Sequence, residues 1–160
     1  MNNAEMAQLT AWHDQEDRHV SLTIRKHGCF VQSVLGEATR PPFAYTVGLF
    51  GMGHPELIIF GLDHESACHT LNWFFERIRG GTNLSPGEIV KPADEAPRFL
   101  VETFPDPADF LFAANRHYRR SDDASVPAYQ LTWDVDGKFS WDPGYPYPDW
   151  LQPRPGEAQA

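Results

Sequence analysis

The residues best suited to chemistry lie in one glycine-rich turn between two expected strands. His54 and Glu56 are two positions apart, so an extended backbone points both side chains the same way. An imidazole beside a carboxylate can act as a general base with its orienting partner. We therefore take His54 and Glu56 as catalytic candidates for hydrolytic or transfer chemistry. The alternative is structural: Pro55 sets the start of a strand and His54 caps the turn.

The strand expected before that turn supplies candidates for ligand binding. In an extended segment over residues 43–50, Tyr45 lies on one face while Thr46 and Gly48 lie on the other. A glycine within a strand often marks a close approach by a ligand or by another backbone. With Trp141, these residues form a predicted small-molecule pocket, for which the sequence specifies no cofactor. The alternative for Tyr45 is a place in the core.

A helix expected over residues 63–80 carries a possible metal pair. His64 and Cys68 are four residues apart and share one helical face, and zinc accepts both side chains as ligands. The sequence has no CxxC and no HExxH motif to accompany them. Cys68 also borders the apolar stripe of the helix, where a cysteine serves equally well as core. A zinc site at His64 and Cys68 is therefore a third alternative.

The spacing of apolar residues predicts the elements that must position these side chains. The Asp136-Gly137 pair predicts a hairpin in which Trp133 and Trp141 face each other. Because strands outnumber helices, the sequence predicts an α+β fold. It consists of a mostly antiparallel mixed sheet with about three helices packed mainly on one face. The spacing places strands over 29–35, 43–50, 56–62, 88–90 and 98–104, and helices over 14–27, over 63–80 and from 106 onward.

Length and composition limit the domain organisation. The chain has 160 residues, of which 41% are hydrophobic, and this suffices for one domain with its own core. We expect that domain over residues 14–150. Residues 1–13 are expected to be a flexible N-terminal segment and 151–160 a disordered C-terminal tail. Five of the fourteen prolines follow residue 142, which predicts a stiff, extended aromatic arm.

Charge and composition narrow the classes of function. The net charge of −9 disfavours binding to nucleic acid. No stretch approaches the length of about 18 apolar residues needed to span a membrane. Two cysteines and no signal peptide favour a cytoplasmic protein. Two hypotheses remain: a small-molecule-binding domain, or a non-catalytic protein–protein interaction module using the acidic face and the C-terminal arm. The oligomeric state is not specified.

Four segments of the sequence resemble a known family: GCFVQSV, PPFAYTVGL, GHPELIIFGL and QLTW with DGKFSWDPGY. From about Arg18 to Trp150 the chain resembles the bacterial domain of unknown function 4262. The family usually has a proline before the hairpin aspartate and another before the last tryptophan, where this chain has Val135 and Ser140. The resemblance implies a small cytosolic protein and supplies no activity. It marks as motif positions Tyr45, Thr46, Gly48, His54, Pro55, Glu56 and Gly61.

Overall fold

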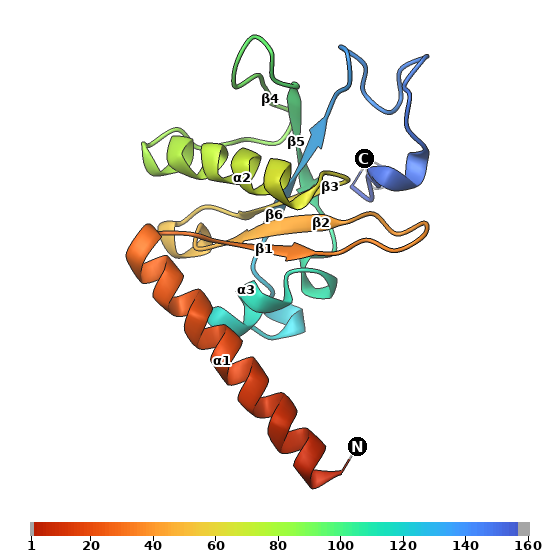
Figure 1. Ribbon diagram of the computed structural model, residues 1–160. Coiled ribbons are helices and arrows are strands. Elements are labelled where there is room, and N and C mark those ends of the chain that lie inside the picture. Colours follow the sequence, from red (N-terminus) through yellow and green to blue (C-terminus); the bar gives the residue numbers. More distant parts are fainter. Residues whose placement is uncertain (1, 157–160) are drawn as a thin grey trace.

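The computed structural model describes residues 2–156 and contains one six-stranded mixed sheet (Figure 1). The strand order is β1-β2-β3-β6-β5-β4. The central strands β3 and β6 are parallel, and every other neighbouring pair is antiparallel. The strands are β1 (Phe30–Val34), β2 (Phe43–Val47), β3 (Glu56–Phe60), β4 (Ile89–Val90), β5 (Phe99–Phe104) and β6 (Ala128–Trp133). The helices are α1 (Asn3–His27), α2 (His64–Arg79) and α3 (Phe112–His117).

The predicted fold class, a single α+β domain with a mostly antiparallel sheet, is confirmed. The helices, however, divide between the two faces, where the sequence predicted them mainly on one. In β3, Leu57 and Ile59 join a core with α2, while Ile58 and Phe60 join a second core with α3 and part of α1. A strand that is apolar on both faces must be covered on both. Figure 1 shows α2 on one side of the sheet and α1 and α3 on the other.

The helices confirm some sequence signals and correct others. Asp63 caps α2 as expected, because its carboxylate accepts the Ser66 amide at 3.2 Å. Helix α1 begins at Asn3, where Asn2 and Glu5 form a capping box, so the predicted start at residue 14 is wrong. Residues 3–13, which the sequence predicted as a flexible segment, are thus helical. The helix expected from residue 106 is a 3-10 turn followed by the short α3.

The C-terminal region differs most from expectation. The Asp136-Gly137 turn forms and is closed by backbone bonds between Val135 and Lys138, but the predicted second strand does not follow. Trp141 stacks on Phe139, with 4.7 Å between ring centroids, and does not face a tryptophan across a ladder. Residues 151–156, where the sequence predicts a disordered tail, pack on the sheet through contacts with β5 and β6. The remaining tail residues, 157–160, lie outside the described residues.

We expect Gly48→Ala to be strongly destabilising, because Gly48 follows β2 with φ at +139°. A Cβ there would lie 2.7 Å from the Gly28 carbonyl oxygen. Backbone strain and this overlap add, so the free energy of unfolding should fall by about 3 kcal/mol. Gly53→Ala is the matched control, with φ at +81° and open space for a Cβ among the described residues. It should cost about 1 kcal/mol. Urea denaturation measures both, and equal losses would show that the approach to Gly28 is unimportant.

Candidate functional site

The carboxylate of Glu56 is the centre of the β2–β3 turn. It is fully buried at the start of β3. One oxygen, Oε1, accepts the Thr46 hydroxyl at 2.8 Å and the Leu49 amide at 3.0 Å. The other, Oε2, accepts the amides of Gly48 at 3.0 Å and Phe50 at 3.1 Å. Three consecutive backbone amides around an anion form a nest of the kind that binds phosphate in other proteins. Here Glu56 occupies the anion site that its own turn creates.

No cation of the described residues forms an ion pair with this carboxylate. Burial is the largest influence and raises the pKa of Glu56 to about 6, while the hydrogen bonds from Phe50, Thr46 and the neighbouring amides act against it. Four donors already occupy the two oxygens. The carboxylate is therefore held as a structural acceptor and is not open to a substrate.

The ring of His54 is buried and forms hydrogen bonds through both nitrogens. Its Nδ1 lies 2.7 Å from the carbonyl oxygen of Pro55, and its Nε2 accepts the Leu84 amide at 3.1 Å. These partners assign the proton to Nδ1. The ring thus ties the turn to the loop after α2. The predicted catalytic pair of His54 with Glu56 stays a hypothesis without support in this geometry, since each side chain bonds to other groups.

The predicted ligand-binding residues are not assembled around one pocket. The hydroxyl of Thr46 accepts the Leu57 amide at 2.9 Å while it donates to Glu56, so it braces the turn. Tyr45 lies in the opposite core, where its hydroxyl accepts the Ala113 amide at 2.9 Å and burial raises its pKa to about 12. The backbone amide of Gly48 donates to the Glu56 carboxylate and does not face a pocket. Trp141 lies exposed on the C-terminal segment.

His64 and Cys68 do come together, as their spacing predicts. The Cys68 sulfur lies 3.7 Å from each ring nitrogen of His64. Ser33 of β1 approaches as well, with its hydroxyl oxygen 2.6 Å from His64 Nδ1. Burial raises the pKa of the Cys68 thiol. Over residues 2–156, no group of three or more His, Cys, Asp or Glu side chains could hold a metal ion. A zinc ion at this place would have His64 and Cys68 as its two protein ligands, and the zinc site stays a prediction.

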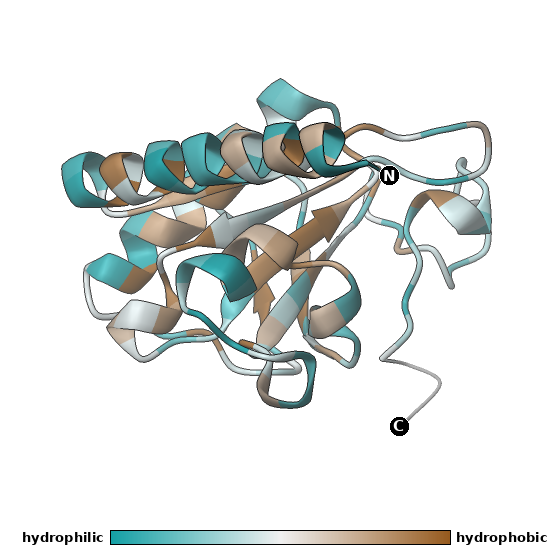
Figure 2. Cartoon of the chain, turned by 90° about the horizontal axis from the view of Figure 1, so that it is seen from below, coloured by the Kyte–Doolittle hydropathy of each residue, from teal (hydrophilic) through white to brown (hydrophobic). Residues whose placement is uncertain are grey.

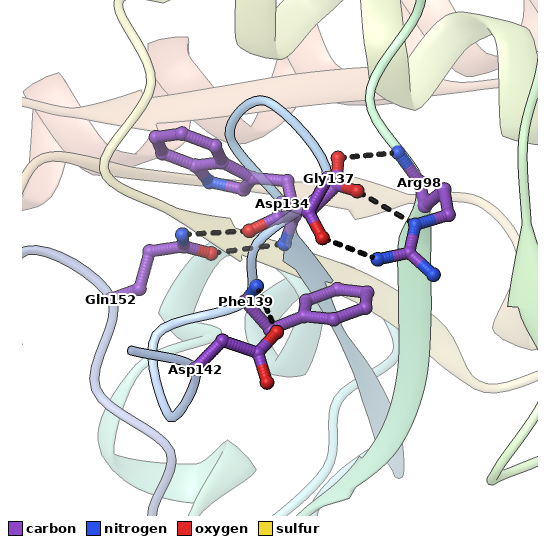
Figure 3. A network of polar contacts seen from close by, with 7 residues as sticks. Arg98, Asp134, Gly137, Phe139, Asp142 and Gln152 are labelled. Carbon is purple, nitrogen blue, oxygen red and sulfur yellow. Dashed lines mark hydrogen bonds and ion pairs between the residues drawn. The ribbon is translucent and has the colours of Figure 1, made fainter. Parts of the chain in front are cut away.

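A polar network that the sequence analysis missed organises the end of the sheet (Figure 3). The Asp134 carboxylate accepts the Arg98 backbone amide at 2.8 Å and its Nε at 2.7 Å. The same guanidinium donates to the Gly137 carbonyl oxygen at 3.0 Å and lies over the Phe139 ring. These partners are more than 30 residues apart, so no local sequence signal reveals them.

Gln152 fixes the segment that follows this network. Its side-chain amide exchanges two hydrogen bonds with the backbone of Trp133, both at 3.0 Å, and also donates to the Tyr145 hydroxyl at 2.7 Å. Figure 3 shows this amide docked at the end of β6. Arg154 adds two charged bonds to Glu102 at 2.8 and 3.0 Å. We call residues 139–156 the C-terminal arm, and these contacts hold it on the domain.

The arm borders an open groove of about 460 Å³ at this end of the sheet. We call it the arm groove. Tyr147, half exposed at 45%, packs edge-on to Trp133 with 6.1 Å between centroids. The groove is lined by Leu62, Lys91, Asp94, Glu95, Ala96, Pro97, Arg98, Trp133, Asp134, Val135, Asp136, Gly137 and Tyr147. It contains none of the residues predicted for the small-molecule pocket.

We expect Glu56→Gln to lower the free energy of unfolding at pH 7 by about 2 kcal/mol or more. The NH2 of glutamine replaces one carboxylate oxygen and cannot accept, so the two donors now bonded to that oxygen lose their partner in a buried site. Glu88→Gln is the matched control, because its carboxylate is half-buried in a pair with Arg77. That change should cost less than about 1 kcal/mol. Denaturant unfolding measures both, and an unaffected Glu56→Gln protein would contradict a structural role.

The raised pKa of Glu56 also predicts a pH dependence. Between its ordinary value of 4.5 and about 6, the folded chain binds more protons at this group than the unfolded chain does. The stability that the raised pKa contributes is therefore fully present below 4.5 and is lost as the pH rises through about 6, while the hydrogen bonds of the ionised carboxylate still contribute at pH 7. Subtracting the Glu56→Gln stability profile from that of the wild type should reveal this fall. A difference that grows with pH over the same range would have the wrong sign.

Comparisons with known proteins place the chain in a family. Residues 23–146 match the family described as Domain of unknown function (DUF4262), which covers more than half of the chain. No curated protein and no solved structure shows a significant match. Along residues 2–156, no helix has the length and apolarity needed to cross a membrane. The matched region contains the whole Glu56 turn and both central strands. The chain therefore belongs to the DUF4262 family of domains of unknown function.

Proposed function

We propose that this protein is a non-catalytic interaction module whose arm groove binds an extended, positively charged segment of a partner protein. The observation that carries this proposal is the lining of the groove, in which aromatic rings meet an excess of carboxylates. The β2–β3 turn supports no comparable proposal for a small molecule, because its polar side chains are buried and already hydrogen-bonded within the protein.

The charges in the arm groove favour a basic partner. Arg98 and Asp134 neutralise each other through their ion pair at 2.7 Å. The remaining charged groups of the lining are the carboxylates of Asp94, Glu95 and Asp136 and the ammonium of Lys91. A net charge of −9 over the whole chain adds long-range attraction for cations. A lysine or arginine side chain entering the groove would thus meet opposite charge.

The aromatic rings favour an extended peptide. Tyr147 offers an exposed flat apolar surface, on which proline rings and cationic side chains both pack well, and the buried Trp133 supports it from beneath. The Gln152 and Arg154 contacts hold the arm in place before any partner arrives. The arm then loses little conformational entropy on binding, and the Tyr147 side chain acts as a preformed anchor.

A direct test uses two labelled peptides of alternating proline and charged residues, one with lysine and one with glutamate. We expect fluorescence anisotropy to show binding of the lysine peptide that weakens as salt is added, and no binding of the glutamate peptide. Tyr147→Ala should weaken the lysine peptide about tenfold or more, which is typical of an aromatic anchor.

Trp150→Ala is the matched control, because Trp150 is an exposed aromatic of the same arm that does not line the arm groove. It should leave the affinity unchanged. Circular dichroism and the thermal midpoint confirm that each variant is folded. Equal affinity for both peptides, or equal losses in the two variants, would refute the arm groove as the binding surface.

A further inference from the structure

Helix α1 is much longer than the domain requires. Its N-terminal half extends away from the sheet, as Figure 1 shows, and residues 2–12 are all exposed. Val20 is its one buried residue among those described. A helical segment of this length is marginal in water by itself, and helices in proteins are stabilised mainly by packing of one apolar face. The N-terminal half of α1 therefore needs a surface to pack on.

The exposed half carries an apolar stripe that continues the docked face of the helix. Met6 and Val20 are fourteen residues apart, close to four helical turns, so they share one face, and Leu9 lies beside them. Met6 and Leu9 are 55% and 43% exposed. Figure 2 shows apolar positions recurring along α1 between hydrophilic ones. The face that contacts the domain near Val20 is thus left uncovered toward the N-terminus.

A groove of about 480 Å³ lies where α1 leaves the domain. The exposed ring of Phe112, at the start of α3, provides its apolar part. Three arginines and one aspartate provide its charge, and Arg116 also pairs with Asp17 of α1 at 2.9 Å. We call it the α3 groove. It is lined by His13, Ala108, Phe112, Asn115, Arg116, Arg119, Arg120 and Asp122.

The N-terminal half of α1 has the complementary charge. Between residues 3 and 16 the helix has three carboxylates, Glu5, Asp14 and Glu16, and no lysine or arginine, while the carboxylate of Asp17 already pairs with Arg116 of the same chain. The exposed apolar stripe, with the Glu5 carboxylate near its start, therefore matches a groove of the same protein that combines an exposed ring with arginines. A contact from one copy to the other is repeated in reverse by symmetry, which gives a closed twofold interface.

We propose that the protein is a homodimer in which the N-terminal halves of α1 pack antiparallel across a twofold axis near Leu9. Glu5 then lies opposite His13 of the other copy, so the first turns of each helix lie beside the α3 groove and its arginines. With the axis at Leu9, Met6 lies opposite Trp12 of the second copy, so both apolar stripes are covered. The carboxylates of Asp14 and Glu16 approach the N-terminal end of the opposite helix, where the helix dipole favours negative charge.

Sedimentation equilibrium of the full chain tests this proposal. The wild type should have a mass of about 36 kDa, twice the 18.1 kDa of one chain. Leu9→Glu should be a monomer, because the axis places the two new carboxylates against each other. The matched control is Leu22→Glu: Leu22 is 56% exposed and lies about four and a half turns from Met6, on the opposite face. It should remain a dimer.

Mixing two charge variants locates the axis. A mixture of Leu9→Glu and Leu9→Lys should form a heterodimer, because opposite charges then meet at the axis. Circular dichroism confirms that the variants keep their helices. A monomeric wild type would mean that α1 packs on something other than a second copy. Dissociation by Leu22→Glu, or no rescue in the mixture, would equally overturn the proposed interface.

Discussion

The fold depends on one buried carboxylate held by the backbone of its own turn. Glu56 lies at the start of the central strand β3 and receives the amides of Gly48, Leu49 and Phe50 together with the Thr46 hydroxyl. These bonds fix the end of β2, the 3-10 turn after it and the start of β3 in one geometry. An uncompensated buried charge is costly, and here the backbone amides and the Thr46 hydroxyl offset part of that cost.

The contacts around this turn reach both layers of the protein. His54 connects it to the Leu84 amide after α2, while the Tyr118 hydroxyl accepts the Gly51 amide at 3.1 Å from the α3 side. Glu56 itself donates its backbone amide to Pro127, just before the parallel neighbour β6. The turn thus aligns the two central strands and the helices that cover them. Polar residues that resemble a catalytic set serve here to join separate parts of the fold.

The sequence predicts elements whose signals are local, and it fails where the decisive contacts join distant segments. The strands and α2 follow from apolar spacing and from the Asp63 cap. The role of Glu56 does not, because a carboxylate two residues after a histidine indicates chemistry unless the path of the turn is known. Gln152 and Arg154 are 19 and 52 residues away from their partners along the chain. No local signal links them, so the sequence predicts a disordered tail for their segment. The Asn2 and Glu5 capping box is a local signal for the start of α1, but apolar periodicity alone does not reveal it.

Titration of the turn amides by NMR tests the central role of Glu56 most directly. If its carboxylate occupies the nest, the amide protons of Gly48, Leu49 and Phe50 share one titration, with an apparent pKa near 6. They should also exchange slowly with solvent above that pH, as buried hydrogen-bonded amides do. Amides that titrate separately near 4.5, or that exchange rapidly at neutral pH, would contradict a turn held by its own carboxylate.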